Sequence, residues 1–208
     1  PSTPDSSSSS PASGTGYAYR NGYPTAEAAS KALDDADLGK AIVAYRFWYP
    51  TVSFEGLFDA NRALGAGDNE VMPILSAGPR HVILTPNSDT PYGGGVLDLS
   101  DGPWVIDLPP GPFIALVNDH HQGWIQDMGL PGPDGGKGGK HLILPPGYKG
   151  KPPAGYYVGW AKSNKVMVAI RSLPANGDMD AALAALQRIK IHPLSAPTAL
   201  LRFVDVTN

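Results

Sequence analysis

Two short polar segments of the chain combine the side chains that catalysis and ligand binding require. Residues 86–92 hold an amide, hydroxyls and a carboxylate, and residues 118–122 read Asn-Asp-His-His-Gln. A carboxylate and an imidazole at strand ends can perform acid–base chemistry, and amides and hydroxyls position a polar substrate. We expect folding to bring the two segments into one shared hollow that binds a small-molecule ligand.

The second segment contains the stronger catalytic candidates. Strand alternation would place Asp119 on one face with His121, and Asn118 on the opposite face with His120. A carboxylate can orient an imidazole so that the ring acts as a general base. We therefore predict a catalytic group of His121 as the base, Asp119 as the residue that orients it, and Asp89 from the first segment.

Other polar side chains are predicted to bind the substrate. They come from both segments and from one earlier arginine: Asn87, Thr90, Tyr92, Asn118 and Arg46. Residues of the types found at positions 87–90 also stabilise turns by bonding their own backbone, which is the alternative interpretation of that stretch. For Arg46 the alternative is an ion pair with a carboxylate at the edge of the core.

Three histidines, His120, His121 and His141, define a candidate metal site. Imidazole and carboxylate groups gathered at one mouth of a barrel would match a divalent first-row transition metal. No His-x-His or His-x-x-x-His spacing supports this site, and adjacent histidines share a metal only across a bulge or turn. The alternative is that these histidines are ordinary polar residues, which is our prediction for His81 and His192.

The spacing of apolar residues predicts the elements that position these groups. Residues 25–65 show three- and four-residue spacing, which indicates a helix that Thr25 caps and that Pro50 should kink or break. A late helix is predicted over residues 178–190, with Asp178 as its cap. Short apolar runs between turn residues predict strands. These runs are residues 81–85, 95–99, 104–108, 113–117, 141–144, 156–160, 166–171 and 200–206.

This pattern predicts an α+β protein that is mainly β. The expected architecture is an antiparallel sandwich or jelly-roll-like domain with an N-terminal helical segment and one late helix. Residues 1–16 are predicted to be a disordered Ser/Pro-rich leader. Residues 17–65 would form the helical segment, and residues 66–208 a β-rich domain that makes one structural unit with it.

Residues 129–140 are rich in glycine but lack the pattern of a phosphate-binding loop, and we expect a mobile loop over the site.

Composition narrows the classes of function. The net charge is −3 and the basic residues are scattered, so we expect no nucleic-acid partner. No apolar run reaches the roughly 18 residues of a membrane span. Cysteine is absent, which excludes disulfides and thiolate catalysis. The beginning of the sequence predicts a localisation. A Ser-rich leader without an initiator Met is typical of a chain that has lost a secretion signal, so we expect export to the periplasm or the extracellular space. The alternative is a cytosolic protein whose N-terminus has been trimmed.

Several longer motifs resemble one bacterial family. They are residues 85–92 (Thr-Pro-Asn-Ser-Asp-Thr-Pro-Tyr), 96–100 (Val-Leu-Asp-Leu-Ser), 102–103 (Gly-Pro), 129–134 (Gly-Leu-Pro-Gly-Pro-Asp), 138–142 (Gly-Gly-Lys-His-Leu) and 144–148 (Leu-Pro-Pro-Gly-Tyr). Over about residues 25–207 the chain resembles the domain-of-unknown-function family 1254, which includes envelope-type proteins. The resemblance implies a β-rich fold, an oligomer and a C-terminal jelly-roll domain of the family 1214 type. It implies no agreed reaction.

Two departures from the family pattern bear on function. The chain has His120-His121 where the resemblance implies an apolar residue and Trp, and His141 where it implies Tyr or Phe. These histidines suggest a branch that can bind a metal or perform acid–base chemistry. The C-terminal jelly-roll domain does not follow in this sequence, so the expected partner is a second chain that carries it, or further copies in a homo-oligomer.

Two functions remain open from the sequence. The first is a ligand- or substrate-binding domain that forms the site-bearing half of an enzyme, with a divalent first-row transition metal if the three histidines meet. The alternative is a non-catalytic binding or assembly module of a multi-chain envelope or extracellular complex. In that case aromatic loops would form the interface, through Tyr148, Tyr156, Tyr157 and Trp160.

Overall fold

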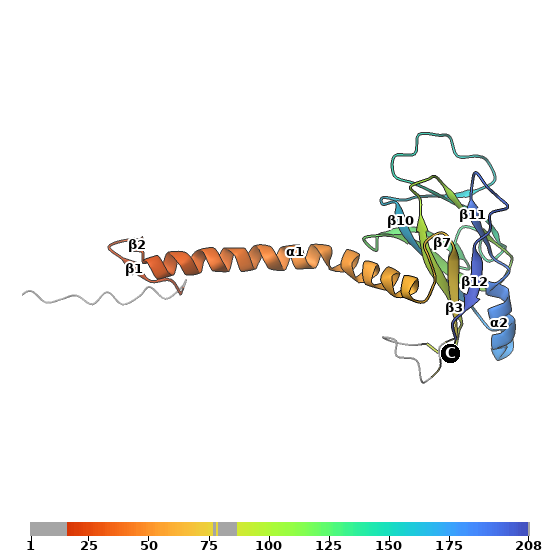
Figure 1. Ribbon diagram of the computed structural model, residues 1–208, viewed down its shortest axis with the longest axis horizontal. Coiled ribbons are helices and arrows are strands. Elements are labelled where there is room, and N and C mark those ends of the chain that lie inside the picture. The colour runs from red at the N-terminus through yellow and green to blue at the C-terminus, as the bar shows by residue number, and fades with distance from the viewer. Residues whose placement is uncertain (1–15, 77, 79–86, 208) are drawn as a thin grey trace, which may run out of the picture. The chain divides into compact units, whose positions relative to one another are not determined.

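The computed structural model describes residues 16–76, 78 and 87–207 (Figure 1). The chain divides into two compact units, Pro1–Tyr49 and Pro50–Asn208. Nearly all of the predicted leader and the whole of the predicted strand at residues 81–85 lie outside the described residues. Both therefore stay predictions, as does export.

The first unit contains a small hairpin and the beginning of a long helix. β1 (Tyr19–Arg20) and β2 (Tyr23–Pro24) pair antiparallel across Asn21 and Gly22, which both have positive φ. An Asn-Gly pair readily adopts this conformation, which matches the twist of a two-residue hairpin. α1 (Ala26–Ala63) follows, and Thr25 Oγ1 accepts a hydrogen bond from the Ala28 N–H at 3.2 Å. The predicted N-cap is confirmed.

α1 does not end at Pro50, so a break of the helix there is wrong. Proline removes one helical donor and crowds the preceding turn. The turns that follow Pro50 contribute Phe54 and Phe58 to a buried cluster with Val96. We infer that this packing offsets the local cost of the proline, since tertiary contacts supply most of a helix's stability.

Two sheets and a late helix form the rest of the second unit. The six-stranded sheet has the order β12 (Arg202–Asp205), β3 (Val71–Leu75), β4 (Tyr92–Asp98), β10 (Lys165–Ser172), β6 (Phe113–Asp119), β7 (Trp124–Gly129). The four-stranded sheet has the order β11 (Lys190–Pro193), β5 (Trp104–Leu108), β8 (Gly139–Leu144), β9 (Tyr157–Trp160). All neighbours are antiparallel except β12 with β3 and β8 with β9. The described residues are thus mainly β, and the predicted fold class is confirmed.

The late helix, α2 (Met179–Leu186), begins where the sequence predicted (Figure 1). Asp178 Oδ1 accepts from the Ala181 N–H at 2.9 Å, which confirms the cap. The helix ends four residues earlier than predicted, because residues from Lys190 onward pair with β5 as strand β11. Neither α1 nor α2, the two α-helices among the described residues, has the length and hydropathy to cross a membrane.

The main core lies between the two sheets. Ile106 and Leu108 of β5 belong to the same buried cluster as Val168 of β10 and Leu186 of α2. Alternation along β10 therefore turns its even-numbered residues toward this core and its odd-numbered residues toward the other side. We call that other side the outer face of the six-stranded sheet. The second half of α1 packs on it, where Phe58 contacts Val96 and Met167.

Candidate functional site

The two polar segments lie at opposite ends of the six-stranded sheet. β4 and β6 flank β10, and both run antiparallel to it. Arg171 of β10 pairs with Tyr92, at the start of β4, whereas Val166 pairs with Asp119, at the end of β6. Positions 166 and 171 are five residues apart, which corresponds to about 17 Å along a strand. The expectation of one shared hollow is therefore wrong.

The first polar segment has the geometry of a turn. Asn87 Oδ1 accepts from the backbone N–H of Asp89 at 2.7 Å, and its amide nitrogen lies 3.5 Å from Thr90 Oγ1. The Asp89 side chain is exposed and Thr90 is buried. This is the backbone-bonded turn that was the alternative interpretation. Tyr92 differs, because its half-buried ring lies beneath the guanidinium of Arg171, at 4.8 Å.

The buried carboxylate of Asp119 organises the second segment. Its Oδ1 accepts from the backbone N–H groups of His121, at 2.9 Å, and Gly123, at 2.7 Å. A Cβ at position 123 would lie 2.7 Å from Asp119 Oδ2, so the close approach requires glycine. Asp119 thus bonds the backbone of His121 and holds a tight turn between β6 and β7.

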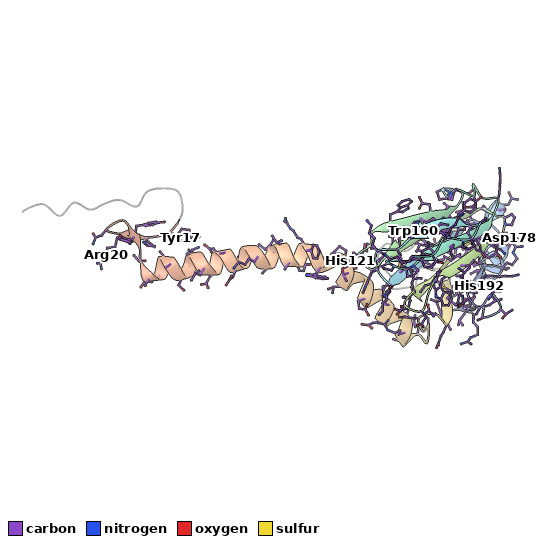
Figure 2. The ribbon with its side chains drawn as sticks, turned by 90° about the horizontal axis from the view of Figure 1, so that it is seen from above. Tyr17, Arg20, His121, Trp160, Asp178 and His192 are labelled. Carbon is purple, nitrogen blue, oxygen red and sulfur yellow. The ribbon has the colours of Figure 1, made fainter. Side chains whose placement is uncertain are left out.

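That turn directs both histidines toward α1. His121 is labelled in Figure 2. Its Nδ1 lies 2.5 Å from Thr51 Oγ1, and the His120 ring stacks on buried Phe58 with centroids 5.4 Å apart. The two imidazoles are themselves stacked, at 6.1 Å. The expected placement of His120 and His121 on opposite faces is wrong, because strand alternation stops at Asp119. The catalytic role of His121 stays a prediction.

A cluster of charged side chains joins α1 to this end of the sheet. Its members are Glu55, Asp59, Arg62, Asp68, His120 and Lys165. Arg62 contacts three carboxylates at 2.5–3.3 Å, and Glu55 also lies 3.0 Å from His120 Nε2 and 3.5 Å from Lys165 Nζ. The hydrogen bond from Arg62, followed by the charge of Lys165, lowers the pKa of Glu55. These charged side chains pair with one another, so the cluster links the second half of α1 to this end of the sheet.

His141 belongs to a separate buried group on β8. Its Nδ1 lies 3.1 Å from the Gln126 amide nitrogen, its Nε2 lies 3.4 Å from Asp134 Oδ1, and its ring stacks on Tyr157 at 5.1 Å. Burial lowers the pKa of His141. Nowhere in the described part of the chain are three or more His, Asp or Glu side chains grouped to hold a metal ion. Within that part of the chain, no such group contains His120, His121 and His141, and their role as metal ligands stays a prediction.

Asp134 also closes the glycine-rich loop that was expected to be mobile. This buried carboxylate accepts from the backbone N–H of Gly129 at 2.8 Å. Gly136 donates to the Gly129 carbonyl at 3.1 Å, so both sides of the loop meet at one residue. The loop is folded back on itself and contacts the buried His141 group through Asp134. Its mobility stays a prediction.

An apolar pocket lies between the second half of α1 and the outer face of the sheet. Its volume is about 290 Å³. The lining comes from α1, β3, β4 and β10 and from one residue after β12: Leu57, Asn61, Leu64, Pro73, Leu75, Tyr92, Gly93, Gly94, Gly95, Met167, Val168, Ala169 and Val206. Tyr92 is the one predicted site residue in this set. The pocket is a second candidate site, and apart from Tyr92 the two polar segments do not contribute to it.

Three consecutive glycines in β4 create the floor of this pocket. Gly94 lies opposite Ala169 on the outer face, and a Cβ at Gly94 would lie 2.9 Å from the Val168 carbonyl oxygen. A Cβ at Gly95 would instead meet Met72, on the core side. The signal in the sequence was a glycine run inside a strand, which often marks close approach by a ligand or backbone. The predicted strand begins at Gly95, so Gly93 and Gly94 lie outside it.

Two other predicted substrate-binding residues do not line the pocket. Asn118 is half-buried on β6 and pairs with Met167. Arg46 is exposed on the part of α1 that belongs to the first unit. Their roles in substrate binding stay predictions.

Comparison with known proteins identifies the family and supports the fold. The chain matches the family described as "Protein of unknown function (DUF1254)" over residues 69–193. A similar solved structure is that of the VPA0106 protein from Vibrio parahaemolyticus, with 22% identity and a TM-score of 0.58 over 73% of this chain. This chain spans 37% of the Vibrio chain. No curated protein matches it. The chain therefore belongs to the DUF1254 family.

Proposed function

We propose that this domain binds a small, largely apolar ligand in the pocket beneath the second half of α1. The pocket volume of about 290 Å³ is roughly twice that of an engineered cavity of about 150 Å³ that binds benzene. Apolar residues from the helix and three glycines from β4 line it, with Asn61 and Tyr92 as the residues that carry polar groups. A concave apolar site with few polar groups is the usual form of a small-molecule site.

The absence of side chains at its floor is the observation that carries this proposal. At the centre of a sheet, a helix normally packs on large outward-facing side chains, as Phe58 does on Val96 and Met167. Two residues further along the same two strands, the outward positions are Gly94 and Ala169, and the helix spans the space above them. Unfilled space forfeits dispersion contacts. A bound apolar molecule would restore those contacts.

A titration with 1-octanol, followed by NMR, tests the proposal. We expect shifts at Met167 and Ala169 and a dissociation constant on the order of 1 mM. Ala169→Phe places a ring in the pocket and should weaken binding at least tenfold. Leu116→Phe is the matched control, because Leu116 pairs with Ala169 on the same face but lies outside the lining. Octanol binding that Ala169→Phe leaves unchanged would show that the pocket is not the site.

A second candidate function, assembly, is favoured by the exposed apolar side chains on the first part of α1. Eight large side chains there are 46–69% exposed: Leu33, Leu38, Ile42, Val43, Tyr45, Phe47, Trp48 and Tyr49. Together they offer several hundred Å², comparable with the roughly 800 Å² per partner of a standard interface. We propose that this segment associates with a second copy of the chain.

Sedimentation equilibrium over a range of concentrations tests the assembly candidate. The natural chain should show a mass above that of the monomer, and Ile42→Lys combined with Phe47→Lys should reduce it to the monomer. Ile114→Lys, an exposed change on the outer face of the sheet, is the control and should leave the mass unchanged. A natural chain that stays monomeric at every concentration would rule this candidate out.

A further inference from the structure

The pocket has a cation beside it. Alternation along β10 places Met167, Ala169 and Arg171 in succession on the outer face. The first two line the pocket, and Arg171 follows one repeat later, about 7 Å along the strand. Its guanidinium lies 4.8 Å from the centre of the Tyr92 ring, and Tyr92 is itself part of the lining. The charge therefore stands at the Tyr92 end of the pocket.

Arg171 is exposed and, among the described residues, has no carboxylate within 4.0 Å. Arg62, at the opposite end of the sheet, contacts three. Asp89 is the acidic side chain of the turn before Tyr92, and it forms no ion pair with Arg171 within that distance. In the contact with Tyr92 the guanidinium carbon lies over the ring, so the N–H groups at its edge can donate to an acceptor.

We propose that the ligand of the pocket is an organic acid, with its apolar body above Gly94 and Ala169 and its carboxylate at Arg171. A carboxylate can accept two parallel hydrogen bonds from one guanidinium, which suits a planar cation already held against a ring. The lining is too apolar to hold the charged group itself, since an ionised carboxylate left without a partner is costly to bury. This inference depends on the proposed ligand-binding function and names the class of its ligand.

Octanoate and 1-octanol form a matched pair of probes, because they share the apolar chain and differ in the charged head. At pH 7 and low ionic strength, octanoate should bind the natural chain about three- to tenfold more tightly than octanol. Arg171→Met keeps an unbranched apolar stem beside Tyr92 and removes the charge. It should abolish the preference while octanol binding stays within twofold. Arg171→Lys should keep part of the preference, and added salt should reduce it.

Lys140→Met removes an exposed cation from the other sheet and is the control, with the preference expected to remain intact. Equal binding of octanoate and octanol by the natural chain would overturn the inference while leaving the apolar pocket in place. A preference for octanoate that survives in Arg171→Met would also overturn it, since a group other than Arg171 would then bind the carboxylate. If neither probe binds, the proposed function fails together with the inference.

Discussion

At the scale of single residues, side chains able to perform catalysis are mainly occupied with the backbone. Asn87 accepts from the N–H of Asp89, and Asp119 accepts from the N–H groups of His121 and Gly123. Strand ends leave backbone N–H groups without ladder partners, and short polar side chains are the nearest acceptors. Polar clusters at strand ends therefore arise from turn formation as readily as from catalysis, and sequence alone does not separate the two.

His141 predicts a pH dependence of stability. Burial lowers the pKa of its ring below the ordinary value of 6.5. The unfolded chain then takes up a proton more readily than the folded chain. Stability that is present above pH 6.5 should therefore be lost as the pH falls from 6.5 through the lowered pKa of the folded state.

Urea denaturation at pH 7.5 and pH 5.5 measures this effect. His141→Gln cannot take up the proton, so its midpoint should fall less between the two pH values than the midpoint of the natural chain. Equal falls in the two chains would contradict the assignment to His141.

At the scale of elements, α1 shows that one helix can hold side chains of the same type in different environments. Phe58 is fully buried against the outer face of the sheet, whereas Phe47 is 66% exposed. The helix itself was predictable, because its spacing and its cap at Thr25 are local features. The part of it that would be buried was not, since burial depends on a sheet formed later in the chain.

Phenylalanine-to-alanine substitutions on α1 should have very different effects on stability. Phe58→Ala removes a ring that packs on Val96, Met167 and His120, and should cost about 3–5 kcal/mol of unfolding free energy. Phe47→Ala, eleven positions earlier on the same helix, should change it by less than about 0.5 kcal/mol. Urea denaturation followed by circular dichroism measures both. Similar losses in the two variants would show that the second half of α1 is not anchored as described.

β1, β2, β3, β7 and β11 are strands that the sequence did not predict, and for β3 and β11 the reason is local. β3 contains Pro73, which argues against a strand in any reading based on propensity. β11 is only four residues long and begins at Lys190, the last residue of the predicted helix. In both cases pairing with a neighbouring strand outweighed the local preference, because burial of Ile74 and Ile191 contributes more than a single residue's propensity.

At the scale of the whole molecule, the two larger sheets share one core. Leu108 of the four-stranded sheet and Phe113 and Val168 of the six-stranded sheet belong to the same buried cluster. Neither sheet buries its inner face without the other. The two sheets are therefore expected to unfold in a single transition.

Leu108→Ala tests this coupling between the sheets. The substitution leaves a cavity between them and should cost about 2–5 kcal/mol. Amide hydrogen exchange in β5 and β8 reports on the four-stranded sheet, and exchange in β6 and β10 reports on the six-stranded sheet. Both measurements should show the same loss of stability. A loss confined to β5 and its neighbours would mean that the sheets are stabilised independently.

Local residue order alone determined the β-rich fold class, several strands and the caps of both α-helices, because these depend on interactions between near neighbours. Only the tertiary structure decided the site. The pairing of β4 and β6 on either side of β10 separates the two polar segments, and it places Gly94 against Ala169, 75 positions later, to form the floor of the pocket. Strand order is set by the free energy of the whole core, which no single segment of the chain contains.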